Sequence, residues 1–136
     1  MKVSKLLPVA FVALLTFTVS CRQVSRQEAD TNTVYEVTDN ALLTTDGLPM
    51  VADFSADWCP PCRKLAPVFD SLKNVYAGSI DFVTFNVDSV ENLARHYNIT
   101  AIPTLLFIAP DGTVVHRMEG YQDAAAIQKA VSDHLD

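Results

Sequence analysis

The chain has 136 residues, of which 49% are hydrophobic and 19% are charged. This composition excludes a collagen-like or disordered chain, and the length suits a single domain. The net charge is −6 and the sequence has no basic run, so we expect no nucleic-acid partner held through its phosphates. Three cysteines are too few for a small fold held together by disulfides. We therefore expect the cysteines to carry out chemistry.

Residues 1–20 have the features of a secretory signal, since two lysines precede 15 uncharged residues that end at Ser20. Such a run is shorter than the ~20 residues that cross a bilayer. It ends in Thr18-Val19-Ser20-Cys21, which resembles the lipobox of bacterial lipoproteins, although that motif usually has Leu at the position of Thr18. The resemblance implies an exported, periplasmic protein with a lipid anchor at Cys21. In two alternatives, cleavage after Ser20 leaves a free Cys21 thiol, or the segment stays uncleaved as an anchor.

The rest of the chain is predicted to be a flexible tether followed by one domain. Residues 21–33 are polar and lack apolar periodicity, whereas the pattern from 34 to 136 predicts alternating strands and helices. Pro110-Asp111-Gly112 is a hairpin signal between the last two strands. The order predicts an α/β fold whose central mixed β-sheet is flanked by helices on both faces. The expected strands are 34–37, 48–54, 80–87, 103–109 and 113–119, and the expected helices are 39–45, 63–76, 90–97 and 123–135.

The strongest chemical signal is Trp58-Cys59-Pro60-Pro61-Cys62. Two cysteines separated by two residues can close a small disulfide ring. A cysteine at a helix N-terminus faces unpaired N–H groups and the positive end of the helix dipole, which lowers the pKa of its thiol. Proline is tolerated in a first helical turn and pushes the residue before it to extended geometry, so Cys59 suits the N-cap. The same restriction on Pro60 leads us to expect the helix to begin at Pro61.

Several separated features in the right order make residues 50–120 resemble the thioredoxin family. Val51-Ala52-Asp53-Phe54 precedes the Cys-x-Pro-Cys motif, and Pro67 follows Cys62 by five residues. Ile102-Pro103-Thr104 matches the family's cis-proline loop, and Gly120 matches the glycine that follows its hairpin. The resemblance implies a thioredoxin fold.

The same resemblance implies the roles of the site residues. Cys59 would be the attacking nucleophile, Cys62 the resolving thiol, and Asp53 a buried carboxylate that exchanges a proton with Cys62. The redox-active disulfide Cys59–Cys62 would need no cofactor and no metal. The residues expected to contact a substrate are Trp58, Pro60, Pro61, Ile102 and a cis Pro103.

The sequence departs from the family pattern at three places. Pro60-Pro61 replaces the Gly-Pro of cytoplasmic thioredoxins, and Ser55 replaces their first tryptophan. Thr84 stands where a lysine usually neighbours the buried aspartate. Loss of that lysine should raise the pKa of Asp53 further.

We expect a protein-disulfide reductase that acts on exported proteins. Pro60 and Pro61 carry neither a charge nor an N–H group, so they stabilise the thiolate less than the His of strongly oxidising relatives, which favours reduction. The alternatives are a disulfide oxidase or isomerase and a dedicated reductant for cytochrome c maturation. Proteins that resemble the latter usually carry an insertion within the thioredoxin core, and the 40 residues between Cys62 and Pro103 leave little room for it. A scaffold used only for binding is a further alternative. We expect a monomer recharged by a membrane thiol donor.

Overall fold

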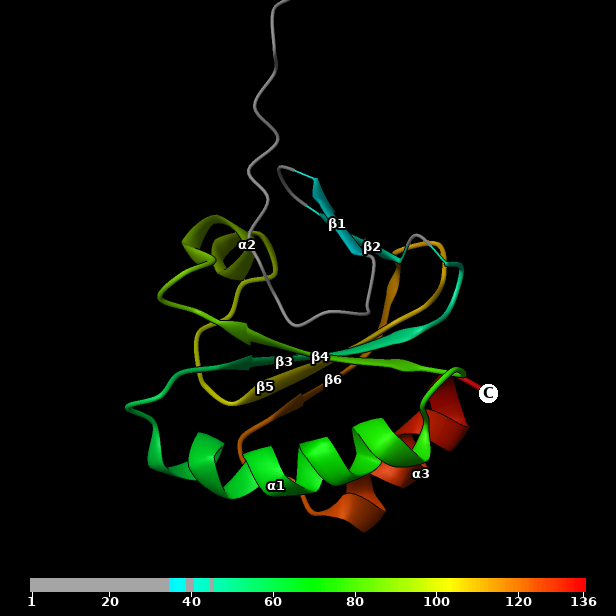
Figure 1. Ribbon diagram of the computed structural model, residues 1–136. Coiled ribbons are helices and arrows are strands. Elements are labelled where there is room, and N and C mark those ends of the chain that lie inside the picture. Colours follow the sequence, from blue (N-terminus) through cyan, green and yellow to red (C-terminus); the bar gives the residue numbers. More distant parts are fainter. Residues whose placement is uncertain (1–34, 39–40, 45) are drawn as a thin grey trace, which may run out of the picture.

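The computed structural model describes residues 35–38, 41–44 and 46–136, and a four-stranded sheet forms its central layer (Figure 1). The predicted segments 1–20 and 21–33, with the lipidation candidate Cys21, lie outside these residues. The elements in chain order are β1 (Tyr35–Thr38), β2 (Ala41–Thr44), β3 (Met50–Ser55), α1 (Pro60–Val75), β4 (Asp81–Asn86), α2 (Glu91–His96), β5 (Thr104–Ile108), β6 (Val114–Glu119) and α3 (Ala124–His134).

The sheet is mixed, as predicted. Its strand order is β4-β3-β5-β6; β3 runs parallel to β4, and β5 runs antiparallel to both β3 and β6. The helices α1 and α3 cover one face, and α2 lies over the other with the β1–β2 hairpin (Figure 1). The predicted α/β class, with helices on both faces and a final antiparallel hairpin, is confirmed.

One predicted element is wrong. The polar stretch 39–45 was expected to hold a short helix, whereas residues 41–44 form β2, paired antiparallel with β1 from Tyr35 opposite Thr44 to Thr38 opposite Ala41. The reason is tertiary: Leu42 is fully buried in the core, and its N–H donates to the Tyr97 hydroxyl at 3.0 Å. A strand paired with its neighbour satisfies the backbone there, which local propensity does not reveal.

Alternation along the strands divides the core between the two faces of the sheet. On β3, Val51 and Asp53 face α1, whereas Ala52 and Phe54 face α2. The α1 and α3 side is the larger cluster and includes Leu65, Phe69, Leu72, Phe82, Leu105, Phe107, Ile127 and Val131. Asp53 is therefore a carboxyl group on the face of the sheet that α1 covers, next to this apolar cluster.

The start of α1 is set by Cys59. This residue is the N-cap with an extended backbone, and Pro60 and Pro61 occupy the first two helical positions. The helix thus begins one residue earlier than expected, because prolines fit a first turn whose N–H groups have no helical partner. The extended geometry of Cys59 is the one that a following proline favours.

Candidate active site

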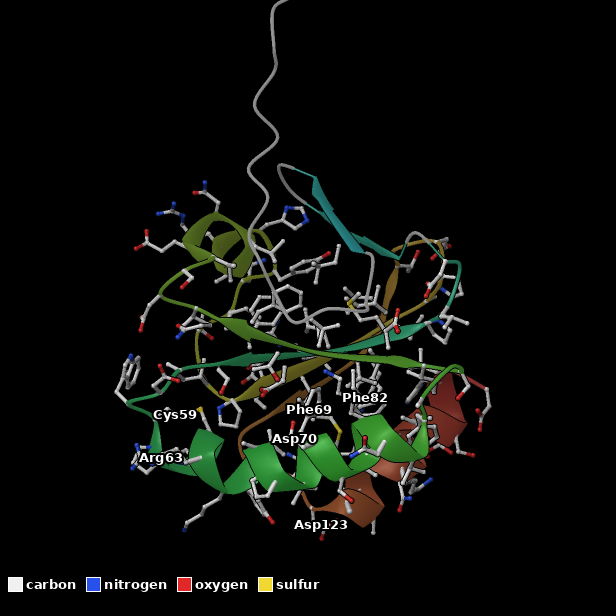
Figure 2. The ribbon with its side chains drawn as sticks, viewed as in Figure 1. Cys59, Arg63, Phe69, Asp70, Phe82 and Asp123 are labelled. Carbon is white, nitrogen blue, oxygen red and sulfur yellow. A yellow bond between two sulfur atoms is a disulfide. The ribbon has the colours of Figure 1, made fainter. Side chains whose placement is uncertain are left out.

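Cys59 and Cys62 form a disulfide, with their Cα atoms 5.3 Å apart. Figure 2 places Cys59 at the N-terminal end of α1, just after the loop that leaves β3. The two residues are 3% and 2% exposed, so most of their surface is shielded from solvent. The Cys62 N–H points at Cys59 Sγ, 3.3 Å away. Since Pro60 and Pro61 have no N–H, this backbone donor is the one that the first turn offers to a Cys59 thiolate.

Asp53 lies in the centre of the sheet and is 2% exposed. Its Oδ1 has no hydrogen-bond partner among the described residues. Burial disfavours the charged carboxylate and raises the pKa of Asp53 from 3.8 to about 7. A group with such a pKa can both accept and donate a proton near neutral pH, as a general acid–base catalyst must.

A pocket of about 160 Å³ connects Asp53 with Cys62. It has room for several water molecules at about 30 Å³ each. The other residues that line it come from the end of β3, from the β3–α1 connection, from α1 and from β4, and they are Ser55, Ala56, Asp57, Arg63, Ala66, Asp70 and Thr84. Asp53 and Cys62 thus share one pocket, an arrangement that the predicted proton exchange between them would require.

The cis-proline prediction is confirmed at Ile102–Pro103. The Ile102 carbonyl oxygen lies 3.7 Å from Cys59 Sγ; in the disulfide the sulfur has no hydrogen to donate, so this is a contact. Ile102 also packs against the small cluster formed by Ala56, Cys59 and Cys62. The loop before β5 therefore forms one wall of the site.

Trp58 forms the exposed rim of the site, with 64% of its surface accessible. Its indole Nε1–H donates to Asp88 Oδ2 at 2.9 Å, which ties the ring to the segment that follows β4. Pro60 is exposed and Pro61 partly so. Trp58 and Pro60 flank Cys59 in the chain, Pro61 follows Pro60, and the Ile102 carbonyl contacts Cys59 Sγ; a substrate contact for these residues and for Pro103 stays a prediction.

Sequence reasoning overlooked three polar residues of this region. Asp88 lies 30 residues from Trp58, and no sequence pattern joins them. Arg63 follows Cys62 directly, lines the pocket and donates from Nη1 to the Asp57 carbonyl at 2.9 Å. Asp70 is two helical turns further along α1 and also lines the pocket. The adjacency of Arg63 to the cysteine motif was the one available signal.

We expect Thr84→Lys to lower the pKa of Asp53 by about one unit or more, because a cation within ~4–6 Å favours the carboxylate. Thr84 is the register partner of Asp53 across the parallel β3–β4 pair, and both line the pocket. The measurement is an NMR titration of the Asp53 carboxyl carbon. Thr84→Met is the matched control, since it fills similar space without charge. The same pKa in both variants would contradict the electrostatic cause.

The fold and the site define a class of protein: a mixed α/β sheet that presents a disulfide at a helix N-terminus above a buried acid. A sequence model of the family named Thioredoxin matches residues 30–133. The chain is 37% identical to thioredoxin of Bacillus subtilis (strain 168) over 92 residues, which cover 68% of this chain and 86% of the relative. It is also 37% identical to thioredoxin of Chlorobaculum thiosulfatiphilum over 105 residues, which cover 74% of this chain and 95% of the relative.

Comparison with solved structures gives the same result. The X-ray structure of Fasciola hepatica thioredoxin superposes with a TM-score of 0.60 at 34% identity, and covers 65% of this chain and 82% of its own. The chain belongs to the thioredoxin family. It is a thiol–disulfide oxidoreductase whose redox centre is its own cysteine pair, and the family generally reduces disulfides in protein substrates.

Among the described residues no group of three or more His, Cys, Asp or Glu side chains could hold a metal ion. Within the same part of the chain, no helix is both long and apolar enough to cross a bilayer.

Proposed function

We propose that this protein is a disulfide reductase of exported proteins. The observation that carries the proposal is the Cys59–Cys62 pair at the start of α1, where two prolines leave a single backbone N–H facing Cys59 Sγ. Weak stabilisation of the thiolate makes the reduced form a stronger electron donor. An oxidase needs the opposite, a dithiol form stabilised by nearby positive charge or donors.

The reaction runs from the dithiol form in two exchanges. The Cys59 thiolate attacks one sulfur of a substrate disulfide, forms a mixed disulfide and releases the first substrate thiolate. Asp53, through water in the shared pocket, takes the proton of Cys62. The Cys62 thiolate then attacks Cys59 Sγ, closes the internal disulfide and releases the second substrate thiolate. Two electrons pass to the substrate, and a dithiol donor must return two electrons to regenerate the protein.

The substrate approaches along the rim of the site. The Ile102 carbonyl contacts Cys59 Sγ on one side, Pro103 follows Ile102 through a cis peptide, and Trp58 lies next to Cys59 in the chain. An extended segment can pair with free backbone groups of such a loop, which gives affinity without demanding a particular side chain. A reductase that serves many exported proteins requires this tolerance.

The test of this function is the reduction of insulin by the purified protein with dithiothreitol as donor, followed by turbidity as the chains separate. We expect catalysis well above that of dithiothreitol alone. If the protein instead catalyses disulfide formation in a reduced, unfolded protein and fails to speed insulin reduction, it is an oxidase.

The location is part of the proposal. The signal-like residues 1–20 and the lipobox-like Thr18–Cys21 segment support export to the periplasm and a lipid on Cys21. A membrane thiol carrier would then supply the electrons, since cytoplasmic reductases cannot reach the protein.

We expect the protein purified from bacterial membranes to begin at Cys21 and to carry a mass increment for acyl chains. Cys21→Ser should abolish the increment and release the protein from the membrane fraction. Intact-mass spectrometry of both proteins is the measurement. A chain that begins after residue 20 without added mass would support the soluble secreted alternative, and an intact N-terminus would support the uncleaved anchor.

A further inference from the structure

The loop of residues 97–103 connects α2 to β5 and carries the cis peptide Ile102–Pro103. Its Ile102 carbonyl lies 3.7 Å from Cys59 Sγ, so the position of this loop sets one wall of the substrate site. The loop starts at Asn98, whose φ of +50° lies in the left-handed region that Asn tolerates at the end of a helix. The Asn98 N–H donates to the Arg95 carbonyl and the Ile99 N–H to the Ala94 carbonyl, which closes the end of α2. Contacts from β6 add to this local support.

Arg117 on β6 holds the beginning of the loop. Its Nη1 donates to the Tyr97 carbonyl at 2.8 Å and its Nη2 to the Asn98 carbonyl at 2.9 Å. Its Nε donates to Glu119 Oε1, also at 2.9 Å, so all three nitrogens of the guanidinium are engaged. The carbonyls at a helix C-terminus carry partial negative charge and lack helical partners, so a cation there is doubly favourable.

The same strand holds the end of the loop. The Gly120 N–H, three residues after Arg117, donates to the Pro103 carbonyl at 2.8 Å. From the first residue of β5, the Thr104 hydroxyl donates to the Ala101 carbonyl of the loop at 2.7 Å. Arg117 near the end of β6 and Gly120 just after it thus bind the two ends of the segment that carries Ile102 and Pro103. Of these contacts, only the hydrogen bonds donated by Arg117 depend on a side chain of β6.

We propose that Arg117 is a positioning residue for thiol–disulfide exchange with protein substrates. Its guanidinium fixes the 97–103 loop so that the backbone of Ile102 and Pro103 is already in position when an extended substrate segment binds at Cys59. The proposal rests on the proposed function, because a wall for a substrate strand matters only if the protein exchanges disulfides with polypeptides. Arg117 itself touches neither sulfur, and its effect passes through the loop.

Lysine cannot take over this task. Its single ammonium is a point donor, whereas the planar guanidinium spans two successive carbonyls and a carboxylate at once. Without the hydrogen bonds from Arg117, the loop samples positions in which the backbone of Ile102 is not aligned with a substrate strand. Part of the binding free energy of the substrate is then spent on ordering the loop. A small disulfide makes no such pairing and needs only the sulfur of Cys59.

The test compares Arg117→Met and Arg117→Lys with the matched control Glu119→Gln, which removes the ion pair but leaves the two carbonyl bonds. Each purified full-length protein is assayed with insulin and with the small aromatic disulfide 5,5′-dithiobis(2-nitrobenzoate). We expect kcat/KM for insulin to fall about tenfold in both Arg117 variants, mainly through KM, which is the scale of one or two charge-assisted hydrogen bonds. The rate with the small disulfide and the behaviour of Glu119→Gln should stay near wild type.

Other outcomes separate the two proposals. An equal loss of activity with insulin and with the small aromatic disulfide would show general damage to the site. An unchanged KM for insulin in Arg117→Met would show that the hydrogen bonds from Arg117 to the loop are dispensable. Either result overturns the positioning role. If Arg117→Met does not fold, Arg117→Lys, which keeps the stem and the charge, decides. Oxidation of a reduced peptide by the disulfide form is measured in parallel. A wild type that catalyses only this direction refutes the proposed reductase, and the KM for the reduced peptide, compared between wild type and Arg117→Met, then tests the role of Arg117.

Discussion

Replacement of Asp53 by Asn is expected to stabilise the oxidised protein at alkaline pH and to change its stability little near pH 4. In the unfolded chain this carboxyl ionises near 3.8, whereas in the folded protein its pKa is about 7. Between these values the folded protein holds a proton that the unfolded chain has released, so wild-type stability falls as the pH rises from about 4 through about 7. Above that range the folded protein contains a charged, buried carboxylate, and the free energy of unfolding of the wild type is lowered by the full amount.

The size of this effect follows from the pKa. A rise from 3.8 to about 7 corresponds to about 4 kcal/mol at high pH, of which the Asn variant recovers a part because its amide also lacks partners in the pocket. The measurement is urea unfolding of both proteins at pH 4.5, 7 and 8.5. Asp88→Asn controls for the loss of one negative charge at an exposed site. A stability difference that does not change with pH would contradict the account of Asp53.

Replacement of Cys62 by Ser is expected to stop the reaction after its first half. Cys59 can still attack a substrate disulfide, but no resolving thiol follows, so a covalent one-to-one complex with the substrate accumulates. Cys59→Ser removes the nucleophile and forms no complex at all. Turnover in either variant should fall by on the order of 10³-fold or more, as it does when a catalytic nucleophile is removed.

Non-reducing electrophoresis and mass spectrometry of the complex measure this outcome. The chain has a third cysteine, Cys21, and Cys21→Ser should turn over insulin as the wild type does. A complex formed by Cys59→Ser, or sustained turnover by Cys62→Ser, would show that the assigned order of attack is wrong.

The fold was predictable from sequence wherever periodicity and turn signals agreed. The strand before the cysteines, the helix after them and the last hairpin all have unambiguous apolar spacing, and their boundaries differ from prediction by only a few residues. The segment 39–45 failed because it is short and polar, and its strand depends on pairing with β1 and on burial of Leu42. Asp39-Asn40, a dipeptide typical of turns, was a usable hairpin signal.

The site was predictable to the extent that a motif carried it. Cys59, Cys62, Asp53 and Pro103 stand in family spacing; in the structure Cys59 and Cys62 are bonded, Asp53 and Cys62 line one pocket, and Pro103 follows Ile102, whose carbonyl contacts Cys59 Sγ, through a cis peptide. Asp88 and Arg117 act across 30 and about 20 residues of sequence. Such contacts follow from the register of strands and the angle of a loop, which local patterns do not encode.

The reduction potential of the Cys59–Cys62 couple is the most direct test of whether the protein acts as a disulfide reductase. It is measured on the purified protein by equilibration with dithiothreitol and glutathione buffers and by quantifying the remaining thiols. We expect a value near the reducing end of the range for this fold, about −270 mV. A value near the oxidising end, about −120 mV, would contradict it and make the protein a catalyst of disulfide formation.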